Sequence, residues 1–268
     1  MLQGLTDFLP LPDDVHLILL NRILGWNKPE ISLLIAMQAG ALVAVICYYL
    51  ADLIKIAYYM VEAVAKRREG PVAKIGICLV IASAPSIITI LFTSQYIARN
   101  PIKPNIAGWI SIFCGLLIAV SAYVDRHLVW RNIVKVEGER RDSLRHISWQ
   151  QALFVGVAQA LMVIPGASRS SMSFSAGLLL GLRTQAAARF SILLALPVII
   201  LSICIDASSM NLQSEIIYFN IYELILAAGS TFIFSLFSIY LFVKYLGKFV
   251  LKTFVTLSIL FGLAILFF

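Results

Sequence analysis

The feature that most constrains this chain is a series of apolar runs, each close to the length of a membrane-spanning helix. A helix needs about 20 apolar residues to cross roughly 30 Å of hydrocarbon. Hydrophobic residues make up 60% of the 268 residues and charged residues only 13%, whereas soluble domains contain about 45–50% and about 25%. A water-soluble fold could not bury so much apolar surface, and the sequence predicts a single all-α polytopic membrane domain over residues 1–268.

Six of these runs are predicted to be transmembrane helices, and two others are interrupted. The six spans cover residues 31–50, 75–92, 106–123, 187–205, 224–243 and 249–267. The interrupted stretches are 2–24, which contains Pro10 and Pro12, and 152–182, which contains Pro165. Because proline removes a helix hydrogen bond that hydrocarbon cannot replace, we predict a re-entrant helical hairpin at each interruption.

The basic residues lie mainly between the apolar runs and do not form a stripe on a polar domain. The net charge is +7, but Lys and Arg concentrate in segments 62–74 and 125–147, whereas 206–221 contains neither. Short loops rich in Lys and Arg face the cytoplasm and its anionic lipid. We therefore expect a multi-pass protein with the two basic loops inside and 206–221 outside, and no nucleic-acid partner.

This orientation makes the two hairpins open on opposite sides of the membrane. Three spans follow each hairpin, so the chain is predicted to contain an inverted repeat, with repeat one at 1–147 and repeat two at 148–268. Sequence matches support the duplication: 32–36 recurs at 191–195, and three residues of the first break recur in the second, namely Gln3, Leu5 and Pro10 as Gln159, Leu161 and Pro165. In transporters of this design, broken helices meet near the midplane and their N-termini face an anionic group.

The first interruption carries acidic and amide side chains. Gln3 and Asp7 are four residues apart, which places them on one face of a helix, and Asp13, Asp14 and His16 follow the prolines. Carboxylates at membrane depth mark function by default, and their hard oxygens suit a divalent cation, Mg²⁺ or Ca²⁺, held by Asp7, Asp13 and Asp14. The alternative for Asp13 and Asp14 is capping of the following helix. His16 is a candidate general acid, base or nucleophile, or otherwise a polar interfacial side chain.

The second interruption carries the elements of an anion site. Arg169 offers a planar fork to phosphate, Ser168, Ser170 and Ser171 add hydroxyl donors, and the helix N-terminus adds backbone N–H groups. The alternative is an arginine that reaches for the headgroups. Gln38, within the first span, either contacts the substrate or hydrogen-bonds across a helix interface. Together the two breaks predict a pyrophosphate site that stabilises the charge of phosphoryl transfer.

These residues resemble the undecaprenyl-diphosphatases linked to bacitracin resistance. The resemblance rests on the run 4–10 with His16, on 38–40 and on the run 165–170. It implies a hydrolase of the bacterial inner membrane that removes the terminal phosphate of undecaprenyl diphosphate, with two re-entrant hairpins and a divalent cation. Such an enzyme recycles the lipid carrier of peptidoglycan synthesis, which links it to cell wall biogenesis, cell shape and bacitracin resistance. We predict catalytic roles for His16, Arg169, Asp7 and Asp13, and substrate binding by Gln3, Ser168, Ser170, Ser171 and Gln38.

The first motif departs from the family pattern. Gln3 stands where the family usually has Glu, Asp7 where it has a second Glu, and Pro12 and Asp13 where it has two serines. The metal site is therefore either rebuilt or lost. The main alternative is a catalytically impaired relative that binds or translocates polyprenyl phosphates, and a third is an unrelated secondary transporter. The oligomeric state is open, with a homodimer as one alternative.

Overall fold

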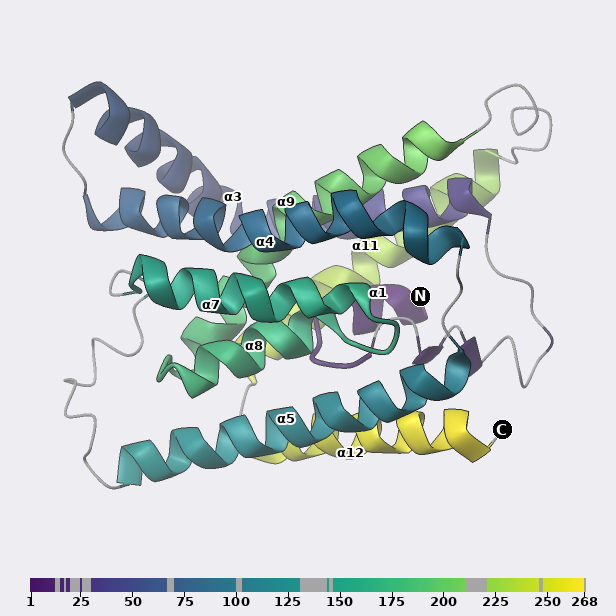
Figure 1. Cartoon of the computed structure of the whole chain (residues 1–268). Helices are drawn as coiled ribbons and strands as arrows, with labels where there is room; N and C mark the ends of the chain where they lie inside the picture. The colour runs from purple at the N-terminus through teal and green to yellow at the C-terminus, as the bar shows by residue number, and fades with distance from the viewer. Residues whose placement is uncertain are drawn as a thin grey trace.

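The chain folds into a bundle of helices (Figure 1). This computed structural model describes residues 1–12, 15, 16, 18, 19, 25, 30–66, 70–99, 103–130, 144, 147–210, 221–245 and 248–267. The regular elements of this part of the chain are α1 (Leu2–Thr6), α3 (Ile31–Lys66), α4 (Pro71–Arg99), α5 (Pro104–Trp130), α7 (Trp149–Ala160), the 3₁₀ helix η2 (Leu161–Val163), α8 (Arg169–Leu179), α9 (Thr184–Ser209), α11 (Ile221–Lys244) and α12 (Lys248–Phe267).

Each of the six predicted spans lies inside one of the long helices. Five helices, α3, α4, α5, α9 and α11, are long and apolar enough to cross a membrane, and the apolar part of α12, Leu251–Phe267, is shorter. Large apolar side chains on their outer faces are bare, with Val64 83% and Phe92 81% exposed. Soluble monomers rarely expose so much apolar surface, so the expectation of an all-α polytopic membrane protein is confirmed at this level.

Both predicted interruptions are present. α1 ends at Thr6 and a turn follows at residues 7–10. In the second half, α7 ends at Ala160 and η2 follows it to Val163. The chain then turns back through Gly166, whose φ of 89° favours glycine. α8 then begins at Arg169 and runs beside α7 (Figure 1).

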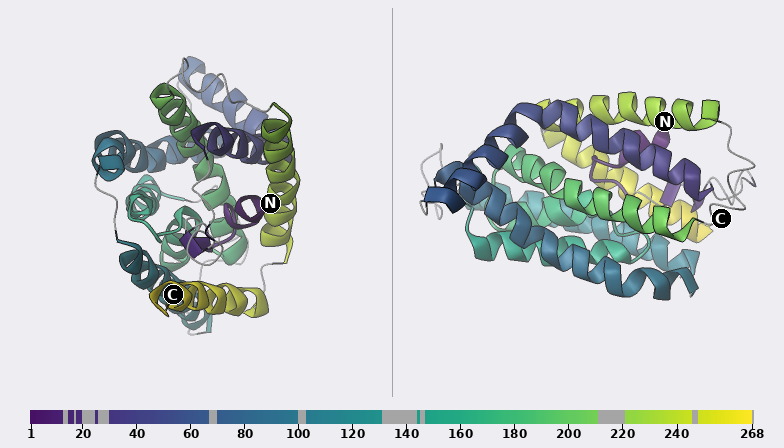
Figure 2. Two further views of the ribbon diagram at one scale, coloured as in Figure 1. Left: turned by 90° about the vertical axis from the view of Figure 1, so that its right-hand side faces the viewer. Right: turned by 90° about the horizontal axis from the view of Figure 1, so that it is seen from above.

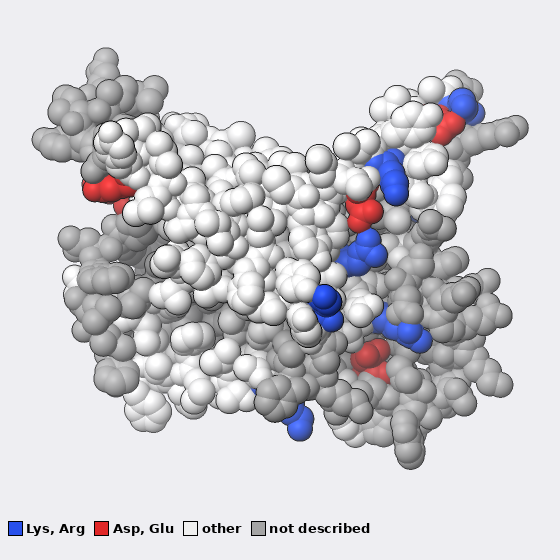
Figure 3. Space-filling view, turned by 180° about the vertical axis from the view of Figure 1, so that it is seen from behind, with Lys and Arg blue, Asp and Glu red and all other residues white. Residues whose placement is uncertain are grey.

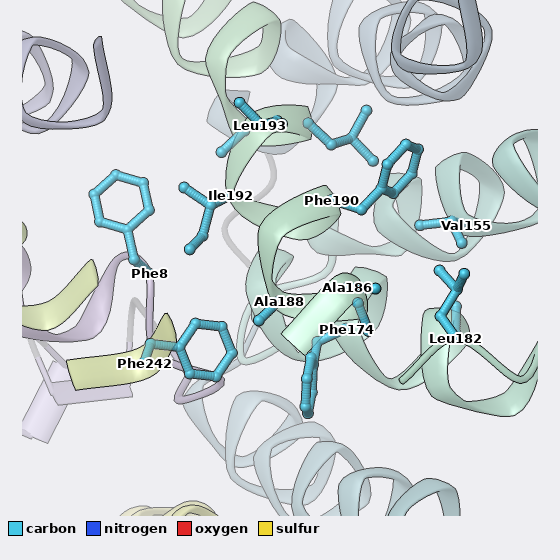
Figure 4. Packing of buried hydrophobic residues seen from close by; sticks show 14 of the residues in the cluster. Phe8, Val155, Phe174, Leu182, Ala186, Ala188, Phe190, Ile192, Leu193 and Phe242 are labelled. Atoms are coloured by element: carbon cyan, nitrogen blue, oxygen red, sulfur yellow. The ribbon is translucent and has the colours of Figure 1, made fainter. Parts of the chain in front are cut away.

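The long helices surround the broken segments (Figure 2), and the part of α9 from Ala186 to Ile199 contributes many of the buried core residues. α9 packs against α3, α4, α8 and α11. Its buried Ile192 lies toward Phe8, which follows α1, whereas its buried Phe190 lies toward Val155 of α7 (Figure 4). The rings of Phe174 in α8 and Phe242 in α11 pack in the same cluster, with their centroids 5.3 Å apart. This central packing fixes both broken segments against one helix.

Small residues let several helix backbones approach closely. A Cβ added to Gly40 of α3 would overlap the backbone of Ala228 in α11, and one added to Gly156 of α7 would overlap Ala82 in α4. Where α5 meets α12, the Ser111 hydroxyl donates a hydrogen bond of 2.8 Å to a backbone carbonyl. Membrane helices associate through such small residues because lipid provides no hydrophobic drive between them.

The contact at Gly40 predicts a measurable difference between two identical substitutions. Gly40→Ala should lower stability by about 1–3 kcal/mol, because the new methyl group forces α3 away from α11. Gly229→Ala on the neighbouring helix meets nothing within 4 Å and should leave stability unchanged or raise it. Thermal unfolding of the purified proteins in detergent compares them, and equal midpoints for both variants would argue against the close approach.

Candidate active site

The two interrupted segments touch each other directly. Arg169 is the first residue of α8, and its Nη2 donates a hydrogen bond of 3.3 Å to the backbone carbonyl of Asp7. The same guanidinium lies 5.9 Å from the ring centroid of Phe8. The Ser170 hydroxyl donates to the backbone carbonyl of Leu9. The second break therefore holds the turn that follows α1, as expected for segments that meet inside the bundle.

A cavity of about 180 Å³ opens at this contact. It is lined by Gln3, Asp7, Gln38, Ala41, Met162, Ala167, Arg169, Ile199 and Ser202. The residues come from α1 and the turn after it, α3, η2, the second break and α9. Four predicted site residues from three separate parts of the sequence thus share one cavity.

Two amide oxygens in this cavity lack a partner. Oε1 of Gln3 and Oε1 of Gln38 are buried and accept no hydrogen bond from any residue that the structure describes. The Asp7 side chain is buried beside them. An unsatisfied buried acceptor costs roughly 1–3 kcal/mol, so the arrangement favours a ligand with hydrogen-bond donors or positive charge.

The Gln38 side chain also connects the cavity to a residue that the sequence did not single out. Its Nε2 donates a hydrogen bond of 3.1 Å to Oδ2 of Asp206, near the end of α9. This bond fixes the orientation of the Gln38 amide group, and its Oε1 accepts no hydrogen bond from a described residue. Asp206 directly follows the apolar run of α9. An acidic residue at the end of a predicted span was the sequence feature that could have marked it as a site residue. Of the two alternatives for Gln38, the structure contains the helix-to-helix bond.

The serines of the second motif support the arginine but do not line the cavity. The Ser168 side chain caps α8 by accepting from the Ser171 backbone N–H at 3.3 Å, and its oxygen lies 2.9 Å from that of Ser170. Ser170 in turn holds the first break, as described above. The Ser171 hydroxyl is buried and has no partner among the described residues. Two of the three hydroxyls therefore have internal partners in this structure.

The remaining predicted residues are not brought into the cavity lining. His16 is 5% exposed and lies near the Pro12 carbonyl, but neither ring nitrogen has hydrogen-bond geometry with a described residue. It is not among the residues that line the cavity. Asp13 and Asp14 lie outside the described residues, so their predicted roles stay predictions.

The donor set of the cavity fits a hard divalent cation. Within the described residues, no three side chains of His, Cys, Asp or Glu gather in one place. The carboxylate of Asp7 and the two amide oxygens of Gln3 and Gln38 nevertheless share the cavity, and carboxylate and amide oxygens are the ligands that Ca²⁺ and Mg²⁺ accept. These three side chains would hold the cation.

Fold and site together define a polytopic membrane protein with a buried polar cavity where two broken helices meet. Comparison with known families shows to which family of membrane proteins the chain belongs. The family described as "Bacitracin resistance protein BacA" matches residues 1–264. The chain belongs to this family.

Curated relatives match along the whole chain. It is 32% identical to the undecaprenyl-diphosphatase of Alcanivorax borkumensis over 269 residues, which covers 100% of this chain and 95% of the relative. It is 33% identical to the undecaprenyl-diphosphatase of Nitrosococcus oceani over 271 residues, with the same coverage of both chains. The undecaprenyl-diphosphatase 2 of Stutzerimonas stutzeri is 32% identical over 75% of this chain and 71% of its own length.

Proposed function

We propose that the chain hydrolyses undecaprenyl diphosphate to undecaprenyl phosphate and inorganic phosphate, and so recycles the lipid carrier of peptidoglycan synthesis. The observation that carries this function is the cavity in which Arg169, from one broken helix, faces Asp7, from the other. The names of the relatives supply the substrate. An anion-binding guanidinium beside cation-binding oxygens is the pairing that a diphosphate requires.

Arg169 binds the terminal phosphate of the substrate. Its guanidinium has five N–H donors, and one of them is used by the Asp7 carbonyl, so the others are available to phosphate oxygens. The bond to the Asp7 carbonyl orients the planar group before substrate arrives. Arg169 also offsets the negative charge that develops as the bond between phosphorus and the bridging oxygen breaks.

Asp7, Gln3 and Gln38 line the same cavity and would hold the divalent cation. A divalent cation held there would supply positive charge that offsets the charge of the diphosphate and of the departing group. Asp13 and Asp14 are further proposed ligands. His16 and Asp13 are the further proposed catalytic residues. His16 either accepts a proton from the water that attacks the terminal phosphorus, or attacks that phosphorus itself to form a phosphohistidine that water then hydrolyses; in both cases undecaprenyl phosphate is the leaving group. Ser168, Ser170 and Ser171 bind the substrate through their hydroxyls. Ser168 and Ser170 first give up their internal partners, whereas the Ser171 hydroxyl has none to give up among the described residues.

The proposed membrane topology has six spans and two re-entrant hairpins in an inverted repeat. Its support is a pattern of packing that repeats when α1, α3, α4 and α5 of the first half are paired in order with α7, α9, α11 and α12 of the second. The contact of α1 with α11 then corresponds to that of α7 with α4, and the contact of α3 with α11 corresponds to that of α9 with α4. The pairs α3 with α9 and α5 with α12 also match across the two halves. A pseudo-two-fold axis relating 1–147 to 148–268 would produce this pattern. The proposed location is the bacterial inner membrane, with the polyprenyl diphosphate as the lipid partner.

Phosphate release by the purified chain tests this function. Wild-type protein in detergent with undecaprenyl diphosphate and Mg²⁺ or Ca²⁺ should release inorganic phosphate. Excess chelator should lower the rate at least ~10-fold, because the cavity then lacks a cation, and added cation should restore it. Lipid binding without any release of phosphate would refute the hydrolytic function and favour a relative that binds or translocates the lipid.

A further inference from the structure

A second cavity lies farther along α3 and α9, where α11 packs against them. Its volume is about 430 Å³, and it is lined by Tyr48, Tyr49, Asp52, Gln185, Arg189, Tyr240, Val243 and Lys244. We call it the Tyr49 pocket. α9 contributes Ile199 to the active-site cavity and Arg189 to this one, so the two are separated by about 15 Å along the helix axis. The proposed diphosphatase reaction does not use this pocket.

Tyr49 gives the pocket a buried polar group without a good partner. Its side chain is 4% exposed, and its hydroxyl, next to the Arg189 guanidinium, lacks a partner of good geometry among the described residues. The α3 backbone leaves helical geometry at the same residue, with φ −107° and ψ 16°. The half of α3 beyond this bend leans out from the bundle (Figure 1). The bend and the orphan hydroxyl thus occur together where the pocket opens.

Two cations and one carboxylate line the pocket. Nη2 of Arg189 lies 2.8 Å from Oδ2 of Asp52, and both side chains are partly exposed. Nζ of Lys244 donates to the Tyr240 hydroxyl at 2.6 Å. The ion pair uses part of the arginine fork, which has further N–H donors, so the lining keeps a net positive charge. On the face seen in Figure 3, most Lys and Arg side chains gather toward the right-hand end.

We propose that the Tyr49 pocket binds the phosphate headgroup of a lipid. Phosphate oxygens accept hydrogen bonds from the Tyr49 hydroxyl, the Arg189 guanidinium and Lys244, which are the strong donors for such an anion. Tyr48 and Tyr240 present rings with polar tips, which is the side chain that membranes favour at headgroup level. The partial exposure of Arg189 and Asp52 gives a headgroup access from the adjacent leaflet. This inference stands whether or not the chain hydrolyses a diphosphate.

Binding of dodecyl phosphate to the full-length chain tests the proposal. The parent protein is Arg169→Ala in a neutral maltoside detergent, so that the active-site cavity does not contribute. Dodecyl phosphate should bind to it, and adding Tyr49→Phe or Arg189→Gln should each weaken binding about 10-fold, since each loses a hydrogen bond to a charged group. Tyr58→Phe, on an exposed tyrosine of the same helix, is the matched control and should bind as the parent does.

Competition with inorganic phosphate distinguishes a lipid headgroup from a free phosphate ion as the ligand. Inorganic phosphate at the same concentration should displace little dodecyl phosphate, and equal competition would overturn the lipid assignment in favour of a free anion. Tyr49→Phe removes a single oxygen and preserves the packing volume, so it carries the test even where thermal unfolding shows that Arg189→Gln is destabilised. Unchanged affinity in folded Tyr49→Phe would overturn the proposal, whatever the outcome for Arg189→Gln.

Discussion

Replacing Arg169 with alanine should lower the rate of phosphate release from undecaprenyl diphosphate by about 1,000-fold. Among the described residues that line the cavity, Arg169 is the one cation. Its removal leaves the developing negative charge in a buried site without its main hydrogen-bond donor. Steady-state release of phosphate by purified wild type and variant, each at saturating cation, measures the ratio.

Two further variants separate charge, geometry and folding in that result. Arg169→Lys keeps the charge but loses the planar fork, so its rate should fall between those of wild type and Arg169→Ala. Lys55→Ala, on an exposed site of α3, should retain the wild-type rate. Thermal unfolding should show a folded Arg169→Ala protein. Phosphate release at the wild-type rate by that folded variant would be incompatible with a catalytic role for the guanidinium.

Replacing Asp7 with asparagine should lower phosphate release about 100-fold at low Mg²⁺, on the scale of losing one charged ligand or donor in a catalytic site. Asp7 is buried and is the one acid among the described residues that line the cavity. Asparagine preserves its shape but removes the charge that attracts a divalent cation. The variant should therefore recover part of its rate as Mg²⁺ is raised, which a titration of rate against cation concentration measures.

The matched control for Asp7 is Glu62→Gln. Glu62 forms a surface ion pair with Lys66, with an oxygen–nitrogen distance of 2.6 Å, and such pairs contribute little to stability. This variant should have the wild-type rate and cation dependence. A cation titration of Asp7→Asn that coincides with that of wild type would exclude Asp7 from the cation site.

The sequence predicted the helices well because apolar runs and prolines act locally. All six expected spans fall in helices, and Pro10 and Pro165 mark the two real interruptions. The predicted first span ends at residue 50, next to the bend at Tyr49, and α3 continues beyond that bend to Lys66. A polar residue such as Asp52 ends an apolar run without ending the helix, because its backbone can still form helical hydrogen bonds. Its side chain pairs with Arg189 in the Tyr49 pocket.

The candidate site was predicted in part. The meeting of the two breaks followed from the repeat and from residue chemistry, and Gln3, Asp7 and Arg169 do share a cavity. The hydrogen bond from Gln38 to Asp206 joins residues 168 positions apart, and no local pattern encodes such a pairing. The substrate contacts of the serines stay predictions. The sequence analysis did not foresee that Ser168 caps the N-terminus of α8, a role that the orphan backbone N–H groups of a helix start call for.

The central claim is that Arg169 and Asp7, from two broken helices, act on one diphosphate. A double-mutant cycle on kcat/KM for phosphate release, using Arg169→Ala, Asp7→Asn and the combined variant, tests it most directly. Residues that act as a unit are strongly non-additive, so the account predicts a combined loss far smaller than the product of the two single losses. A combined loss equal to that product would contradict it.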